Sequence, residues 1–328
     1  MIVDIHPHLA PRSAFANAQA AGMALAPRLV ETEKGPEPVI ESGGVRLGPL
    51  PAEMVDFGLA YKALTRMGVE AALFSSPPFT ILNELPAPEG VAWSRVFNDA
   101  LADTLRGHPG MYGLAMVPLQ DPASAAAELR RAVTGLGFKG VEIPSNINGV
   151  ELDSPGLDGF YAAVEELDVP ILIHPHYVAG GNRMKEYYLR NLVGNPLDTT
   201  LAADRLVLGG VLDRFPRLKV CLSHAGGYFV AGLGRLDHGW RVSAQARSKC
   251  QKLPSAYLPN LYFDTIAHSA TWLRFVVGQV GVDHVLLGTD LPFDMGDADP
   301  VAAVNALGLD AAGAAAIAGG NAARLFKL

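Results

Sequence analysis

Residues Val169–His176 read VPILIHPH, a short apolar run that ends in two histidines. An apolar run of about four to eight residues, rich in β-branched side chains, is typical of a strand that is buried on both faces. The helical stretch Gly159–Leu167 precedes this run, and a second helical stretch, Thr199–Arg214, follows it. A buried strand between two helices predicts a parallel βαβ unit.

The same alternation of strand and helix continues along the chain. Eight strands are predicted, at Ile2–Ile5, Val69–Phe74, Met111–Val117, Gly140–Ile143, Pro170–His174, Leu218–Ser223, Asn260–Asp264 and His284–Gly288. The other predicted helices are Ala52–Met67, Trp93–Arg106, Pro122–Thr134, Thr271–Val280 and Pro300–Leu307. Eight strand–helix units in 328 residues predict an α/β fold of the (β/α)8 TIM-like barrel type. A doubly wound open sheet is the alternative, because periodicity alone does not separate the two folds.

Residues 9–50 interrupt the alternation and are rich in proline and glycine. We therefore expect one barrel domain, 1–328, with a small insertion at 9–50 after the first strand. The range Pro38–Leu47 is a candidate hairpin within it. Loops that follow barrel strands lie at the face that carries the active site, which favours a lid or a pocket wall. The alternative is a surface loop that has no role in the site.

Composition limits the class of protein. Hydrophobic residues make up 49% of the chain and charged residues 18%, so the chain can bury a large core and is not disordered. The net charge is −7 and no run of five like charges exists, which argues against nucleic acid and anionic membranes as partners. Two cysteines, Cys221 and Cys250, and an N-terminal segment without an apolar signal region favour a cytoplasmic protein.

Histidine and aspartate residues end several of the predicted strands. His6 and His8 end the first strand, and His174, His224 and Asp290 end the fifth, sixth and eighth. Since side chains two apart on a strand point to the same side, the two N-terminal histidines face one mouth of the barrel. Imidazole nitrogens and a carboxylate suit a divalent ion such as Zn²⁺. Each residue alone has a structural explanation, but five at four strand ends predict a metal site.

Two further histidines lie in loops near the predicted mouth. His176 stands two residues after His174, and His268 follows the seventh strand. A substrate-binding role and a purely structural loop role are both open for each of them.

Longer segments of the chain resemble the amidohydrolase superfamily, and within it the branch of metal-dependent decarboxylases typified by 2-amino-3-carboxymuconate-6-semialdehyde decarboxylase. The segments that carry the resemblance occur in the family's order and include Met116–Pro122, Gly137–Ile143, Leu192–Pro196, Gly210–Val220, His224–Gly227 and Gly288–Phe293. The resemblance implies a TIM-like barrel and a single divalent ion, most simply Zn²⁺ with Mn²⁺ as the alternative. No lysine stands where it would bridge two ions.

The family pattern also implies roles for individual residues. It matches the metal ligands to His6, His8, His174 and Asp290. His224 matches the catalytic acid and base beside the ion, and Asp290 also takes part in the proton transfer. Glu142 lies on the fourth predicted strand. It is either part of the site or a structural carboxylate that pairs with an arginine at the barrel mouth.

Two arginines match residues that bind the substrate carboxylate in the family, Arg46 loosely and Arg235 more closely. In some relatives the second arginine acts across a dimer interface, so a homodimer that pairs near Phe229–Trp240 is expected. The alternative is that this apolar segment packs on its own barrel. The prototype has a further arginine at a position where this chain has Ser243, and this departure argues against the prototype's own substrate.

The resemblance implies a non-oxidative decarboxylase, a carboxy-lyase that acts on a small aromatic or muconate-type carboxylic acid. A hydrolase of a lactone or an amide is the alternative, because the same metal centre can be directed at a carbonyl group. Release of CO₂ from such acids separates the two activities.

Overall fold

The computed structural model describes residues 1–32, 35–42 and 45–328. Its central sheet has eight parallel strands that neighbour one another in chain order. The strands are β1 (Val3–Asp4), β5 (Ala71–Phe74), β6 (Met111–Met116), β7 (Gly140–Pro144), β10 (Ile171–His174), β11 (Val220–Leu222), β12 (Leu261–Asp264) and β13 (Val285–Leu286). The N–H of Ile5 donates to the carbonyl of Leu287 at 3.0 Å and brings the first and last strands together. The predicted barrel is confirmed, because a doubly wound sheet would reverse its strand order.

Apolar side chains fill the end of the barrel opposite the histidines. Leu172 of β10 and Cys221 of β11 belong to one buried cluster with Leu325 and Phe326. The last two lie on α12 (Asn321–Phe326), so this helix covers the N-terminal end of the strands. The closed end leaves the C-terminal end of the barrel as the open mouth.

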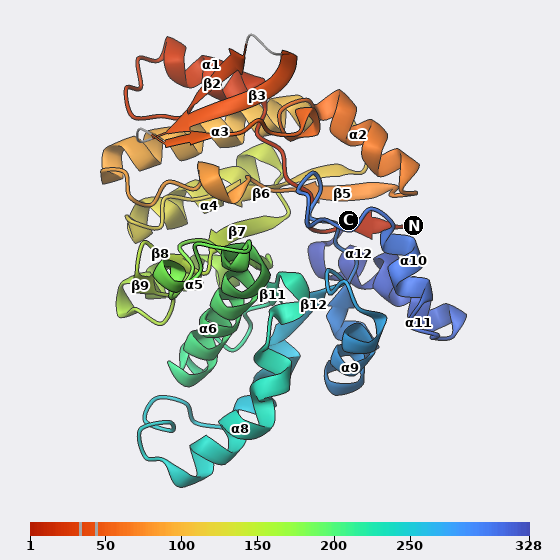
Figure 1. The fold of residues 1–328 in the computed structure, drawn as a ribbon. Coiled ribbons are helices and arrows are strands. Elements are labelled where there is room, and N and C mark those ends of the chain that lie inside the picture. The colour runs from red at the N-terminus through yellow and green to blue at the C-terminus, as the bar shows by residue number, and fades with distance from the viewer. Residues whose placement is uncertain (33–34, 43–44) are drawn as a thin grey trace.

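The outer helices surround the barrel (Figure 1). They are α2 (Phe57–Arg66), α3 (Ala87–Leu105), α4 (Pro122–Leu136), α5 (Asp158–Leu167), α6 (Asn195–Leu208), α7 (Val211–Arg214), α8 (Phe229–Val242), α9 (Ala270–Val280), α10 (Pro300–Asn305) and α11 (Ala311–Ala315). Short 3₁₀ or π turns lie between them, namely η1 (Ala52–Met54), η2 (Pro78–Thr80), η3 (Pro155–Leu157), η4 (Gly181–Arg183), η5 (Arg190–Gly194), η6 (His224–Gly226), η7 (Pro254–Asn260), η8 (Val282–His284) and η9 (Ala316–Gly320). None of the helices in the described ranges is long and apolar enough to cross a bilayer.

The prediction of one continuous helix over Thr199–Arg214 is wrong, because the range forms two helices, α6 and α7. The helix breaks between α6 and α7 at Gly210, whose φ is 70°. A Cβ atom at this position would lie 2.5 Å from the carbonyl oxygen of Lys249, so both the conformation and the space require glycine. The predicted helix Ala52–Met67 is likewise divided, because Asp56 caps α2 by accepting the N–H of Leu59 at 3.1 Å.

The segment between β1 and α2 contains a helix and a separate antiparallel sheet. These are α1 (Arg12–Ala20) and the strands β2 (Arg28–Thr32), β3 (Gly35–Ser42) and β4 (Val45–Leu47). Strands β3 and β4 pair within the range expected to form a hairpin, and residues 43–44 at its turn lie outside the described residues. Helix α1 packs on α3, where the rings of Phe15 and Trp93 are 6.0 Å apart. Figure 1 shows this unit in red and orange against one side of the barrel.

Candidate metal centre

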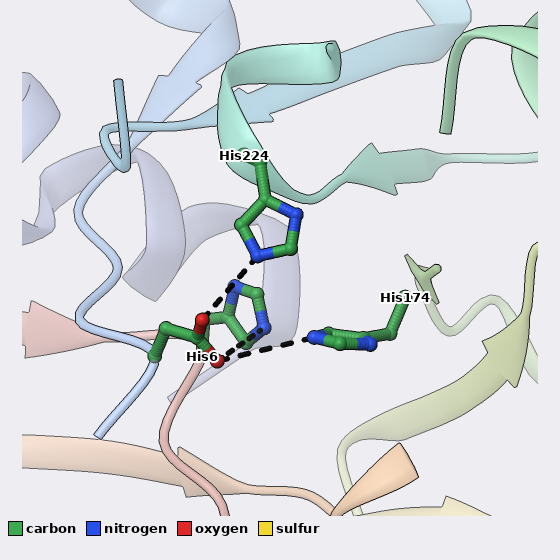
Figure 2. A group of neighbouring side chains, drawn as sticks. His6, His174 and His224 are labelled. Atoms are coloured by element: carbon green, nitrogen blue, oxygen red, sulfur yellow. Dashed lines mark hydrogen bonds and ion pairs between the residues drawn. The ribbon is translucent and has the colours of Figure 1, made fainter. Parts of the chain in front are cut away.

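Side chains from four strand ends converge at the open mouth of the barrel. His6 follows β1, His174 ends β10, His224 follows β11 and Asp290 follows β13. One ligand atom from each of these residues lies within 4.8 Å of all the others. Figure 2 shows that the three imidazole rings point toward one another across a small space. The arrangement brings together the chemistry that a divalent ion requires.

His8 lies against the same group. Its Nε2 atom is 3.1 Å from Oδ1 of Asp290, and its ring centroid is 5.0 Å from that of His6. Its Nδ1 atom lies 3.1 Å from the carbonyl oxygen of Ser76, which can only accept, so Nδ1 carries a proton. All five predicted mouth residues are therefore neighbours. The assignment of His8 as a ligand of the ion, with His224 as the acid and base beside it, stays a prediction.

Asp264 holds two of these histidines and was not assigned from the sequence. Oδ2 of this carboxylate lies 2.8 Å from Nδ1 of His6 and accepts the backbone N–H of His224 at 2.9 Å. Its other oxygen accepts the N–H of Ala225 at 2.7 Å. Burial alone would raise the pKa of Asp264, but these hydrogen bonds and the nearby histidines hold it below its usual value. Its position at a strand end was the signal that could have identified it.

The backbone at His224 is strained in a way that Asp264 supports. His224 and Ala225 have φ values of 55° and 53°, in the left-handed region. Such residues cost about 1 to 3 kcal/mol each and persist where surrounding contacts fix them. The next residue, Gly226, has a φ of 72°, and a Cβ there would lie 2.5 Å from the ring of Phe263. The turn aims the His224 ring back into the mouth.

Three buried imidazole nitrogens of the group have no hydrogen-bond partner among the described residues. They are Nε2 of His6, Nε2 of His174 and Nδ1 of His224. Burial lowers the pKa of His6 and lowers that of His174 much further, so both rings are neutral at pH 7. Buried, neutral and unpartnered nitrogens are costly unless something binds them. The residues present therefore fit a divalent ion.

Asp290 is the common partner of the histidines. Burial would raise its pKa, but the hydrogen bonds to His8 and His224 and the nearby rings of His174 and His6 outweigh that effect and hold the pKa well below the usual range. Asp4 supports the segment from below, since it accepts the N–H of His6 and the N–H and hydroxyl of Thr289. Burial raises the pKa of Asp4 to about 7.

Glu142 lies beneath the same group. Its Oε2 atom accepts the hydroxyl of Ser76 at 2.8 Å, and its Oε1 atom is 3.9 Å from Nδ1 of His8. Burial raises its pKa to about 7. The partners of this carboxylate are thus a serine and a histidine, and no arginine forms an ion pair with it among the described residues.

Two cavities open on either side of Asp290. The larger, of about 490 Å³, is lined by His224 and by apolar side chains that include Leu192, Ile266 and Trp272. The predicted residue His268 also lines it, with Nε2 2.8 Å from the carbonyl oxygen of Met295. The described residues of the 9–50 insertion are not among the lining residues of either cavity, so a lid role for that segment stays a prediction.

The smaller cavity, of about 180 Å³, is lined by His174, His176 and Arg190 together with Phe79 and Phe293. The structure thus brings the predicted residue His176 to the mouth. Burial, followed by the positive charge of Arg190, lowers the pKa of His176 to about 4. Arg190 was not predicted, because a single arginine in a stretch without periodicity gives no signal.

The two predicted arginines lie elsewhere in this chain. Arg46 is on β4 with an exposed side chain, 3.7 Å from the carboxylate of Glu41. Arg235 is on α8 and lines a third cavity, between α6 and α8, together with Asp204. Neither residue lines the cavities beside Asp290. Their proposed contacts with substrate stay predictions.

Comparison with known proteins gives the family. A model of the amidohydrolase family matches residues 3–328. The chain belongs to the amidohydrolase family. It is 34% identical over 239 residues to 2-amino-3-carboxymuconate-6-semialdehyde decarboxylase of Dictyostelium discoideum, a match that covers 72% of this chain and 67% of that protein. The family membership predicted from the sequence is confirmed.

Solved structures share the whole fold. The crystal structure of 5-carboxyvanillate decarboxylase from Sphingomonas paucimobilis matches with a TM-score of 0.84 at 25% identity, over 100% of this chain and 99% of that chain. A dihydroxybenzoic acid decarboxylase from Polaromonas sp. JS666, solved with bound manganese, matches with a TM-score of 0.82 at 23% identity, over 100% and 97%. These proteins are decarboxylases, the class of enzyme that the sequence predicts.

Proposed function

We propose that this amidohydrolase is a metal-dependent, non-oxidative decarboxylase that acts on an aromatic or muconate-type carboxylic acid. The observation that carries the proposal is the position of His224, which lies 3.3 Å from Asp290 and lines an apolar cavity beside the histidine cluster. A proton donor next to a space for a ring is what removal of a ring carboxylate requires. The relatives with decarboxylase activity support the same assignment.

The ion is held by His6, His8, His174 and Asp290 in this proposal. One divalent ion per chain is expected, and Zn²⁺ is favoured because imidazole nitrogens with one carboxylate match its preference, with Mn²⁺ as the alternative. When bound, the ion would polarise the oxygens of the substrate and hold its acid group in place. A site with two ions would need a lysine that bridges them. The lysine nearest to Glu142 in the sequence, Lys139, donates to the carbonyl oxygen of Lys327.

His224 and Asp290 carry the proton. Burial would lower the pKa of His224, but its hydrogen bond to Asp290 and the charges of Asp290 and Asp264 outweigh burial and raise it. A raised pKa favours the protonated imidazole, which can donate its proton to the ring carbon of the substrate. The bond between that carbon and the carboxylate breaks, the electron pair stays on the carbon and takes the proton, and CO₂ leaves.

The larger cavity would hold the ring of the substrate. Leu192, Ile266 and Trp272 present apolar surface to it, and this excludes water from the carbon that becomes electron-rich. Exclusion of water strengthens the contacts of His224 and Asp290 with the reacting group.

A direct test is incubation of the metal-loaded protein with a panel of hydroxybenzoates, carboxyvanillate-type diacids and muconate-type acids. Release of CO₂ with formation of the decarboxylated product, detected by mass spectrometry, is expected from at least one acid. A parallel panel of lactones and amides tests the hydrolase. Hydrolysis of a lactone or amide without CO₂ release from any acid would overturn the proposal.

The homodimer is proposed on the outer surface of α6 and α8. The sequence predicted an interface near Phe229–Trp240 because this segment is apolar. Its residues Phe229, Val230 and Leu233 are buried within their own chain. Leu201 of α6 and Tyr228, which precedes α8, remain 36% and 43% exposed. They offer a smaller apolar surface to a second copy, and light scattering at micromolar concentration tests for the dimer.

A further inference from the structure

The two cavities at Asp290 differ in charge. Both are lined by Asn191, Asn195 and Asp290, so a ligand beside the histidine cluster borders both. The larger cavity has no lysine or arginine among its lining residues. The smaller has one among the described residues, Arg190, which supplies a permanent positive charge to the mouth.

Arg190 is held in place by its neighbours along the chain. It begins the π-helical turn η5, which leads directly into α6. Two residues earlier, the hydroxyl of Tyr188 donates to the carboxylate of Asp294 at 2.9 Å, and Asn191 donates its N–H to the carbonyl oxygen of Tyr188 at 3.0 Å. Asp294 follows Phe293, which lines the same cavity, so the segment that carries Arg190 is bonded to the loop after β13.

The wall facing this segment is also fixed. Asp198 of α6 accepts the amide of Asn146 at 3.0 Å and the N–H of Ala179 at 3.0 Å, and it also accepts the hydroxyl of Ser145. Ser145 in turn accepts the N–H of His176 at 3.0 Å. The smaller cavity is therefore a built space between two anchored loops.

The guanidinium of Arg190 has no hydrogen-bond or ion-pair partner in the part of the chain that the structure describes. The carboxylate of Asp294, which holds this segment, accepts a hydrogen bond from the hydroxyl of Tyr188 and not from Arg190. An arginine beside a cavity with its donors free is suited to a carboxylate, which it can bind through two parallel hydrogen bonds.

We infer that Arg190 binds an acidic group of the substrate that stays on the product, and that it makes the enzyme selective for acids with a second anionic substituent. The inference rests on the proposed decarboxylase function and names the substrate class for it. Arg190 acts in binding and orientation, and the proton transfer remains with His224.

The chemistry of the reaction decides which acid group Arg190 can hold. The carboxylate that leaves as CO₂ loses its negative charge as the bond breaks. An arginine on that group would stabilise the substrate more than the transition state and would slow the reaction. On a retained carboxylate the contact is unchanged through the reaction, so it orients the ring at no cost to the barrier.

The test compares two ligands that differ by one carboxylate, salicylate and 4-hydroxyisophthalate, by titration calorimetry on the metal-loaded protein. The wild type is expected to bind the diacid more tightly. Arg190→Gln is expected to weaken binding of the diacid about 10- to 100-fold, the range of a lost charge-assisted hydrogen bond, and to leave salicylate within about twofold. Arg190→Lys should fall between, because an ammonium lacks the planar fork.

Arg183→Gln is the matched control, since Arg183 ends η4 in the same loop region, is exposed and lines neither cavity. It is expected to bind both ligands as the wild type does. Equal affinity of the wild type for the two ligands, or an unchanged ratio in Arg190→Gln, overturns the inference. The quantity compared is affinity and not CO₂ release, and mass spectrometry of each sample after titration shows whether the ligand is intact. The inference can therefore fail with the decarboxylase intact, and the decarboxylase can fail while Arg190 still selects diacids.

Discussion

The carboxylate of Asp264 lies 2.8 Å from Nδ1 of His6, and both side chains are completely buried. A carboxylate in this position fixes the proton on Nδ1, so the lone pair of Nε2 faces the other histidines. The two residues are 258 positions apart in the chain and meet only because the barrel closes.

Asp264→Asn is expected to lower the affinity for the divalent ion about 10- to 100-fold, because outer partners of ligating histidines contribute that much in other metal sites. Competition with a chelator of known affinity measures it. Asp283→Asn, an exposed change in the turn before β13, is the control. Wild-type metal affinity in Asp264→Asn would show that the orientation of His6 does not depend on this contact.

His6→Ala/His8→Ala is expected to lose the ion. The wild type should contain about one divalent ion per chain, as expected for a mononuclear site with three or four protein ligands. Metal analysis after dialysis gives the content, and it also distinguishes zinc from manganese. Full occupancy in the double variant would exclude these two histidines as ligands.

His224→Ala is expected to lose turnover by about 10²- to 10⁴-fold, the usual contribution of a positioned acid or base. Because His224 lies within the cluster of potential ligand atoms, its metal content must be measured on the same sample. Retained metal with lost CO₂ release supports a role in proton transfer. Loss of the ion together with activity would make His224 a ligand, and near wild-type kcat would remove it from the mechanism.

The barrel could be predicted because each buried strand leaves a local trace. VPILIHPH predicted β10 and the histidine at its end, and the observed strand covers Ile171–His174. Strand-end histidines could be matched to one mouth because parallel strands all point the same way. These inferences need only the local pattern and the topology of the fold.

Other parts of the site depend on contacts that no local pattern records. Asp264 ends a strand as the ligands do, but only the closed barrel shows that it contacts His6 and the turn at His224. The apolar residues Phe229 and Val230 suggested an interface, whereas they pack on their own barrel. A sequence shows that a helix face is apolar and does not show which surface covers it.

Acid should weaken a contact at the other end of the barrel. Hydrogen bonds from Lys219 and Lys327 lower the pKa of Asp168 from 3.8 to about 2. Because the folded pKa lies below the unfolded one, the contact stabilises the protein above pH 4 and loses this effect as the pH falls toward 2. The residue is about half exposed, so screening keeps the contribution below about 1 kcal/mol.

Urea unfolding of the wild type and Asp168→Asn measures this contribution. Asn suits the left-handed backbone at this position, where φ is 50°, so the substitution tests the charge and not the turn. The variant is expected to be less stable at neutral pH by a small margin that shrinks below pH 4 and at high salt. A difference that does not change with pH would attribute the effect to something other than the charge.

Arg235 lies on α8, and the cavity that it lines is between α6 and α8 and does not include Asp290. A buried oxygen of Asp204 in that cavity has no hydrogen-bond partner among the described residues. Within one chain, therefore, Arg235 does not line the cavities beside the histidines. A role in substrate binding then requires the site of a second copy, which the proposed homodimer would bring close to α8.

Mixing Arg235→Ala with His224→Ala tests this arrangement, since each variant alone is expected to be nearly inactive. In a twofold-symmetric hybrid dimer, one site receives His224 from the first chain and Arg235 from the second, and the other site lacks both. Random exchange makes half of the dimers hybrid, so activity should recover to about a quarter of the wild-type value. Arg235→Lys alone should raise KM, because an ammonium cannot replace the bidentate contact. Subunit exchange is verified separately with differently tagged chains. Exchange without recovery would confine Arg235 to its own subunit, where it contacts the α6–α8 cavity and not the substrate.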